Sequence, residues 1–248
     1  DNAVGMAAKA SIATNNATIT LNGANSKGMF GEADGTTKSN VVNNGTIKGV
    51  NGSTVGMAVD GSDATNKSGK SIVLEGKGST GIFGKNGSTV SNAGTIETKI
   101  VAPATQPADS TEGLVGIALN GSTGTNESTG VINLGTAHST GMFGENVSTI
   151  ENAGKITGAK DIAGIVGIAS DKSTVTNVSG AIITLQGIKS TGIFGKAGST
   201  VTNAGTIDAV APTTQPANST EGLVGIALNA STGTNTSTGK IELETTHS

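Results

Sequence analysis

Two histidines and a scatter of carboxylates are the first side chains in this 248-residue sequence to weigh for general acid–base catalysis. His138 and His247 each follow a leucine by four residues, and related stretches of the chain carry Gly78 or Lys189 in that place. A catalytic histidine would not be replaced by glycine in sister repeats. No Ser-His-Asp arrangement accompanies either histidine. We therefore interpret both as solvent-exposed turn residues.

The carboxylates lead to the same conclusion. An enzyme that cleaves polysaccharides needs two acids held at a fixed separation. No acid pair recurs in register, and the carboxylates fall singly at Glu75, Glu97, Glu145, Glu151, Asp208 and Glu242. We expect no enzyme and no catalytic residue, and keep a β-helix polysaccharide lyase or hydrolase as the alternative function.

Composition excludes further classes. The chain has no cysteine, so it has neither a disulfide framework nor a cysteine metal site. Calcium loops of the Gly-Gly-x-Gly-x-Asp type are missing, and we expect no metal and no cofactor. There is no arginine and the net charge is −3, which argues against a nucleic-acid partner. No apolar run reaches the roughly 18 residues that suggest a membrane helix.

Four phenylalanines recur at related positions, Phe30, Phe83, Phe143 and Phe194. Alanine takes the matching place in the intervening segments, at Ala7, Ala58, Ala118, Ala169 and Ala227. The favoured interpretation is core packing, with large residues alternating with small ones. The alternative follows from strand parity: if Ile82 points inward, Phe83 points outward, unless the glycine-rich string bends there. Outward phenylalanines would form an apolar stripe that marks a partner surface.

All four prolines lie in two related inserts, near residues 98–114 and 209–223. Proline cannot donate to a central β-ladder, so we expect both inserts to be loops. Loops on a rigid scaffold concentrate recognition, whereas the plainer interpretation is an inert decoration. The candidate binding residues are Pro103, Thr105, Gln106 and Pro107, and Pro212, Thr214, Gln215 and Pro216.

Pairs of threonines raise a third possibility, an ice-binding solenoid. Ladders of Thr-x-Thr could order water, and the candidates are Thr18-Ile19-Thr20, Thr123-Gly124-Thr125, Thr174-Val175-Thr176 and Thr232-Gly233-Thr234. These pairs do not recur in every repeat, which makes a regular lattice doubtful.

An internal repeat must position all of these residues. A Val-Gly-(Ile/Met)-Ala string alternates along the chain with a Gly-(Ile/Met)-Phe-Gly string, and each is followed by a landmark asparagine. The landmark recurs at intervals of roughly 25 residues, at Asn15, Asn43, Asn66, Asn92, Asn126, Asn152, Asn177, Asn203 and Asn235. Such a period is the size of one coil of a solenoid.

Short alternating stretches identify the kind of solenoid. Val115, Ile117 and Leu119 have period two, and Gly, Asn and Ser separate such stretches. We predict an all-β fold, a single-stranded right-handed parallel β-helix of about nine coils. At a strand spacing of about 4.8 Å, nine coils give a rod on the order of 43 Å long. Residues 1–248 begin and end in mid-pattern, so we expect one β-helix fragment of a longer chain.

The asparagines should stack into a structural ladder. We expect each to lie at a turn with a left-handed backbone, which asparagine tolerates. Stacked amides can also hydrogen-bond from coil to coil.

The string from Ser79 to Ile96, Ser-Thr-Gly-Ile-Phe-Gly-Lys-Asn-Gly-Ser-Thr-Val-Ser-Asn-Ala-Gly-Thr-Ile, resembles repeats of large type V autotransporter adhesins, particularly fusobacterial ones. The resemblance extends over essentially the whole chain. It implies an extracellular passenger on the bacterial surface, anchored in the outer membrane by a C-terminal β-barrel that this sequence lacks. The implied role is a β-helical stalk or adhesin segment. Its partner would be an unidentified protein or glycan on a host or bacterial cell.

Overall fold

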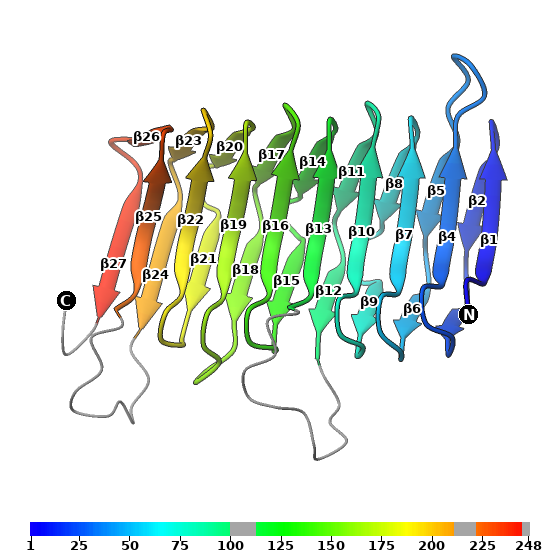
Figure 1. The fold of residues 1–248 in the computed structure, drawn as a ribbon, viewed down its shortest axis with the longest axis horizontal. Helices are drawn as coiled ribbons and strands as arrows, with labels where there is room; N and C mark the ends of the chain where they lie inside the picture. The colour runs from blue at the N-terminus through cyan, green and yellow to red at the C-terminus, as the bar shows by residue number, and fades with distance from the viewer. Residues whose placement is uncertain (100–112, 211–221, 245–248) are drawn as a thin grey trace.

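A computed structural model describes residues 1–99, 113–210 and 222–244. Every named element in this part of the chain is a β-strand. The chain visits three sheets in turn, A, B and C, and then repeats the circuit one layer further along. Figure 1 shows the layers side by side from the N-terminal to the C-terminal end.

Each sheet contains nine strands. Sheet A consists of β1 (Val4–Lys9), β4 (Lys27–Glu32), β7 (Val55–Asp60), β10 (Thr80–Lys85), β13 (Val115–Asn120), β16 (Thr140–Glu145), β19 (Val166–Asp171), β22 (Thr191–Lys196) and β25 (Val224–Asn229). Sheet B consists of β2 (Ile12–Asn15), β5 (Asn40–Asn43), β8 (Asp63–Asn66), β11 (Thr89–Asn92), β14 (Thr123–Asn126), β17 (Thr149–Asn152), β20 (Thr174–Asn177), β23 (Thr200–Asn203) and β26 (Thr232–Asn235). Sheet C consists of β3 (Thr18–Leu21), β6 (Thr46–Gly49), β9 (Ser71–Leu74), β12 (Thr95–Thr98), β15 (Val131–Leu134), β18 (Lys155–Gly158), β21 (Ile182–Leu185), β24 (Thr206–Val210) and β27 (Lys240–Glu244).

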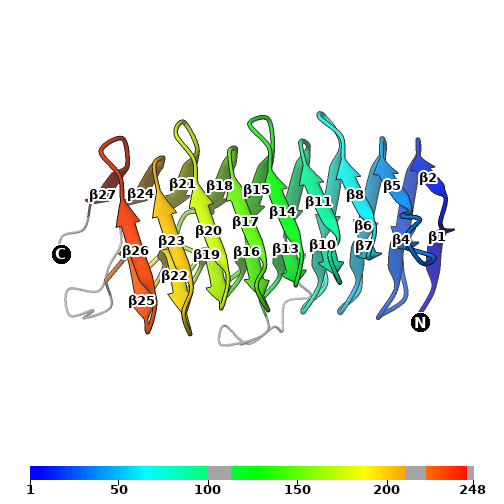
Figure 2. The same cartoon turned by 90° about the horizontal axis from the view of Figure 1, so that it is seen from above.

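All strand pairs within the sheets are parallel, and each strand pairs with its counterpart in the next layer. Landmark residues keep one register, so that Asn66, Asn92 and Asn126 lie beside one another. Figure 2, turned by 90°, shows the same stacking from above. The predicted all-β parallel solenoid is confirmed. We number the coils 1 to 9, each beginning with its strand of sheet A.

The core is a narrow column of apolar side chains from all three sheets. Ile72, Ile96 and Ile132 stack fully buried along sheet C, and Ile82 and Ile117 do so along sheet A. One coil cannot bury these side chains alone, because its neighbours above and below form the walls. Stability therefore comes from stacking of adjacent coils.

Within one coil, a large inward-facing residue in one sheet fills the space left by a small inward-facing residue in another sheet. Leu119 of sheet A fills the space where a Cβ on Gly124 of sheet B would lie, 2.6 Å from the leucine Cδ1. The next coil reverses the assignment, since a Cβ on Gly144 would meet the Cδ1 of Ile150 at 2.7 Å. The cross-section therefore stays filled although the residue types alternate between coils.

A glycine bends every strand of sheet A at its second residue. A Cβ on Gly116 would lie 2.5 Å from the carbonyl oxygen of Gly141 in the next coil, so only glycine fits there. Because of this bend, Val115 faces outward and Ile117 faces inward, although strict period two would give them the same side. The next residue, Ala118, faces outward again.

Within the described residues, no helix is long and apolar enough to cross a membrane.

Candidate functional site

The nine landmark asparagines form a continuous hydrogen-bonded ladder. Each is the last residue of its strand in sheet B, and the Nδ2 of one donates to the Oδ1 of the next. Eight such bonds of 2.8–2.9 Å join Asn15 to Asn235. From Asn43 to Asn203 these side chains are fully buried. All eight bonds run in the same direction, so each amide polarises the next.

One expectation about this ladder is wrong. The ladder asparagines do not have the left-handed backbone that we expected; positive φ occurs in other turns, such as Asn86 at 57° and Asn146 at 55°. The ladder residues end extended strands, and their side chains point inward. Asparagine is needed there because its amide donates and accepts at once.

A second ladder escaped the sequence analysis. The backbone N–H of Ser122 donates to the Oγ of Ser148 at 3.2 Å, and the N–H of Ser148 donates to the Oγ of Ser173 at 3.0 Å. The same pattern joins Ser11, Ser39, Ser62, Ser88, Ser122, Ser148, Ser173, Ser199 and Ser231. Each serine lies four residues before a ladder asparagine, a spacing that could have revealed it. These serines bond the backbone at the turn between sheets A and B.

The phenylalanines lie on the outer face of sheet A. Phe30, Phe83, Phe143 and Phe194 are half-buried and lie outside the apolar core, so the favoured interpretation as core residues is wrong. Strand pairing places each between two alanines, as Phe83 lies between Ala58 and Ala118. Ala58, flanked by Phe30 and Phe83, is only 3% exposed. Ala58 is therefore almost covered, whereas Ala118 and Ala169 stay partly exposed between their flanking rings, and the phenylalanines recur with a period of two coils.

Two further rows flank the phenylalanines. On one side valine alternates mainly with threonine, as in Val55, Thr80, Val115 and Thr140. On the other side lies a polar row, in which Lys85 pairs with Asp60 at 2.8 Å and Lys196 pairs with Asp171 at 3.1 Å. Hydrogen bonds from Lys85 and Asn86 lower the pKa of the Asp60 carboxyl below its usual value of 3.8. The Asp60 carboxylate is therefore stabilised in its charged form.

The threonine pairs are divided between two sheets. Thr174 and Thr176 align with Thr200 and Thr202 on sheet B, and these align with Thr232 and Thr234. The Thr18-Ile19-Thr20 pair lies on sheet C instead. Glu151 interrupts the array on sheet B, and Asp63 stands at a matching position nearer the N-terminus. The uncharged threonine surface on sheet B therefore extends over three adjacent strands, β20, β23 and β26.

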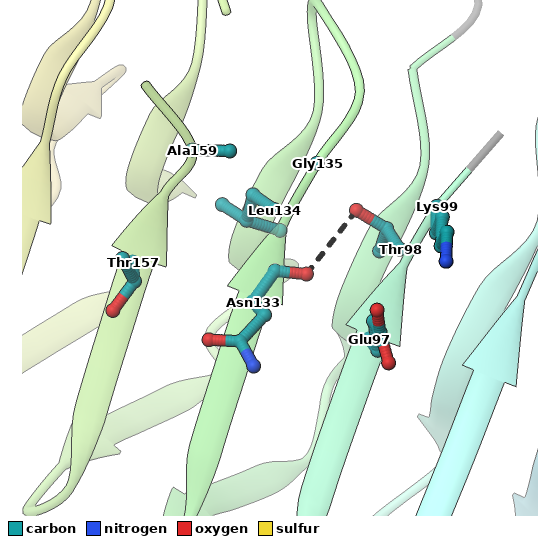
Figure 3. A pocket seen from close by; sticks show the side chains of 8 residues that line it. All are labelled: Glu97, Thr98, Lys99, Asn133, Leu134, Gly135, Thr157 and Ala159. Atoms are coloured by element: carbon teal, nitrogen blue, oxygen red, sulfur yellow. Dashed lines mark hydrogen bonds between the residues drawn. The ribbon is translucent and has the colours of Figure 1, made fainter.

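A pocket of about 360 Å³ lies at the carboxyl ends of β12, β15 and β18 in sheet C (Figure 3). The half-buried side chains of Glu97, Asn133 and Thr157 lie in register along its wall. Thr98 donates to the backbone oxygen of Asn133 at 3.4 Å. Among the lining residues that the structure describes, Glu97 is the one carboxylate, so these residues do not supply the acid pair needed for glycoside hydrolysis.

The remaining candidates for chemistry are dispersed. His138 is exposed in a turn with φ of 58°, and His247 lies outside the described residues. Glu75 forms an ion pair with Lys48 at 3.1 Å. In the ranges that the structure describes, no three His, Asp or Glu side chains come together as metal ligands.

The eight candidate binding residues of the proline-containing inserts lie outside the described residues. The strands that precede the inserts, β12 and β24, belong to sheet C and are separated in it by β15, β18 and β21.

Comparison with known proteins gives one similarity. Residues 58–164 match the family model described as the BigA third pectate lyase-like domain. The matched stretch is less than half of the chain and runs from β7 to the residues just before β19. A pectate lyase-like description agrees with the parallel solenoid. No curated protein and no solved structure matches this chain.

Proposed function

We propose that this chain is a stiff stalk or adhesin segment of a bacterial surface autotransporter, which carries or presents attachment to host cells or to other bacteria. The observation that carries the proposal is the unbroken stacking of nine coils by three sheets and two side-chain ladders. Each coil is bonded only to the coils next to it, so the free energy of unfolding and the length of the rod both increase with the number of coils. Such a scaffold suits holding a binding site away from a membrane.

The match to the BigA domain supports a surface β-helix, and the repeats resemble autotransporter adhesins. A role without catalysis is supported by the dispersal of the acids and of His138. We propose the two proline-containing inserts as the attachment arms, since two similar arms on one rod permit two-point binding. The partner class is a cell-surface protein or glycan.

Beads coated with the purified chain at matched density test the adhesive role. We expect them to bind epithelial or bacterial cells at least tenfold better than bare beads. Replacing residues 102–108 and 211–217 by Gly-Ser segments of equal length should abolish most of this binding without changing the circular dichroism. A matched control replaces the exposed connection at residues 34–37, between β4 and β5, and should bind like the parent.

Two results would contradict parts of the proposal. If coated beads bind cells no better than bare beads, the adhesive role is wrong and the stalk role alone remains. If incubation with acidic and neutral glycans generates new chain ends, the protein is an enzyme.

A further inference from the structure

The outer face of sheet A has a shape that fits a copy of itself. Phenylalanines project from coils 2, 4, 6 and 8, while the coils between them carry alanine at the same position. Each gap between two rings is therefore floored by an alanine, as Ala118 lies between Phe83 and Phe143. Rings of one molecule could fill the gaps of another if the two faces met half a period out of step.

Symmetry then selects the orientation. A parallel two-fold pair would place ring against ring at the same height. Shifting one of two parallel rods by one coil would place rings over alanines. The shift would, however, remove the two-fold symmetry, and the same contact could then repeat into an open filament instead of a closed dimer. In an antiparallel pair, a two-fold axis midway between two coils places every phenylalanine opposite an alanine and closes the dimer.

Charge selects the register. Among the nine coils described, two antiparallel registers bring eight into contact with rings over alanines. One has its axis between coils 4 and 5, and places Asp60 opposite Glu145 and Lys9 opposite Lys196. The other has its axis between coils 5 and 6, and places Asp60 opposite Lys196 and Lys85 opposite Asp171. Only in the register with its axis between coils 5 and 6 do no two like charges face each other along the polar row. Contacts between like charges would destabilise the dimer.

The area is also sufficient. Eight coils at about 4.8 Å and a strand width of about 20 Å give a contact face of about 770 Å². A standard protein–protein interface buries about 800 Å² per partner. The face is apolar along its centre and charged along one edge, as a specific interface requires.

We propose that the outer face of sheet A is a homodimerisation surface, on which two rods pair antiparallel with the phenylalanines of each seated over the alanines of the other. The rods then join side by side, with the axis between β13 and β16. This inference does not depend on the adhesive role, and purified protein in the absence of cells tests it.

Sedimentation velocity of the intact chain should show a concentration-dependent dimer. The double variant F83A/F143A removes two ridges and should weaken dimerisation at least tenfold. The double variant A118F/A169F fills two gaps and should weaken it to a similar extent, although it adds apolar surface. The variant Thr174→Ala on the outer face of sheet B is the control and should dimerise normally. Circular dichroism verifies that each variant is folded.

Spin labels measure the orientation, since the chain has no cysteine of its own. The variant Ala197→Cys places a spin label in an exposed turn of coil 8, and the variant Ala230→Cys places one in an exposed turn of coil 9. In the proposed dimer the two labels at position 197 are five coils apart, about 24 Å along the axis. The two labels at position 230 are seven coils apart, about 34 Å along the axis. Equal distances for the two positions would indicate parallel rods and overturn the proposal. A chain that remains monomeric at millimolar concentration, or tighter association of A118F/A169F, would also overturn it.

Discussion

The asparagine corner and the outer face of sheet A follow different periods along the same rod. At the corner every coil carries the same residue, and at the face phenylalanine and alanine alternate. From Asn43 to Asn203 each corner amide accepts from one neighbouring asparagine and donates to the other, so any other residue interrupts the chain of bonds. An outward side chain makes no such bond, and its neighbours need only fill the space around it. Buried hydrogen bonding therefore requires the same residue in every coil, whereas packing on the outer face allows two residue types to alternate from coil to coil.

The largest effect is expected from breaking the corner in the middle of the rod. Asn126→Ala removes two 2.8 Å bonds and leaves the Asn92 amide and the Asn152 oxygen with fewer partners inside the core. Buried unsatisfied groups cost 1–3 kcal/mol each, so we expect a loss of about 3 kcal/mol. Chemical denaturation followed by circular dichroism measures the free energy of unfolding.

Asn15→Ala provides the matched control. Asn15 ends the ladder and bonds only one neighbouring asparagine, so its replacement should cost much less. Equal losses at the two positions would show that the ladder does not act as a stack.

The serine ladder should be the next most sensitive feature. Ser148→Ala removes the acceptor of the Ser122 N–H and the 2.7 Å bond from Ser148 to the Glu145 carbonyl. We expect a loss of about 1.5 kcal/mol, because a buried donor loses its partner. Ser148→Thr keeps the hydroxyl, and its stability would separate loss of the bond from loss of volume.

A turn between the two regions contains an irregular residue. Val147 is 83% exposed and has φ of 64°, which is costly for a β-branched side chain. The equivalent turns carry Gly87 and Gly198 with positive φ. Val147→Gly should raise the free energy of unfolding by about 1 kcal/mol, since the left-handed strain is relieved.

The reverse substitution is the control for this turn. Gly87→Val should destabilise the protein by a similar amount, as measured by the same denaturation. A destabilised Val147→Gly variant would contradict the strain argument.

A smaller effect than at the asparagine corner is expected on the outer face. Phe143→Ala removes a half-buried ring that contacts no core bond network, so the monomer should lose less than about 1.5 kcal/mol, the lower limit for a fully buried ring. Thermal unfolding at low protein concentration isolates the monomer. A loss as large as that of Asn126→Ala would show that the face is as constrained as the corner.

The repeat made the fold predictable. Landmark residues recurred at nearly constant spacing, and short alternating segments between Gly and Asn turns admitted few other architectures. The exposed turn position of His138 could also be predicted from the sequence. The serine column was equally regular, but serine is so frequent that its fixed distance from the asparagine went unnoticed.

What the sequence determined by itself is the set of residues that share a column, because equal spacing forces equal position in a stacked coil. It did not determine which way two of those columns point. The asparagines were assigned to a left-handed turn and instead end extended strands with buried amides. The phenylalanines were assigned to the core and instead face outward. Only the tertiary structure decided this, because it buries Ile82 and thereby turns Phe83 outward, and because it stacks the asparagine amides within bonding distance inside the rod. The close approach of Gly116 to Gly141 reverses a different column, since the bend turns Val115 outward although Ile117 faces inward.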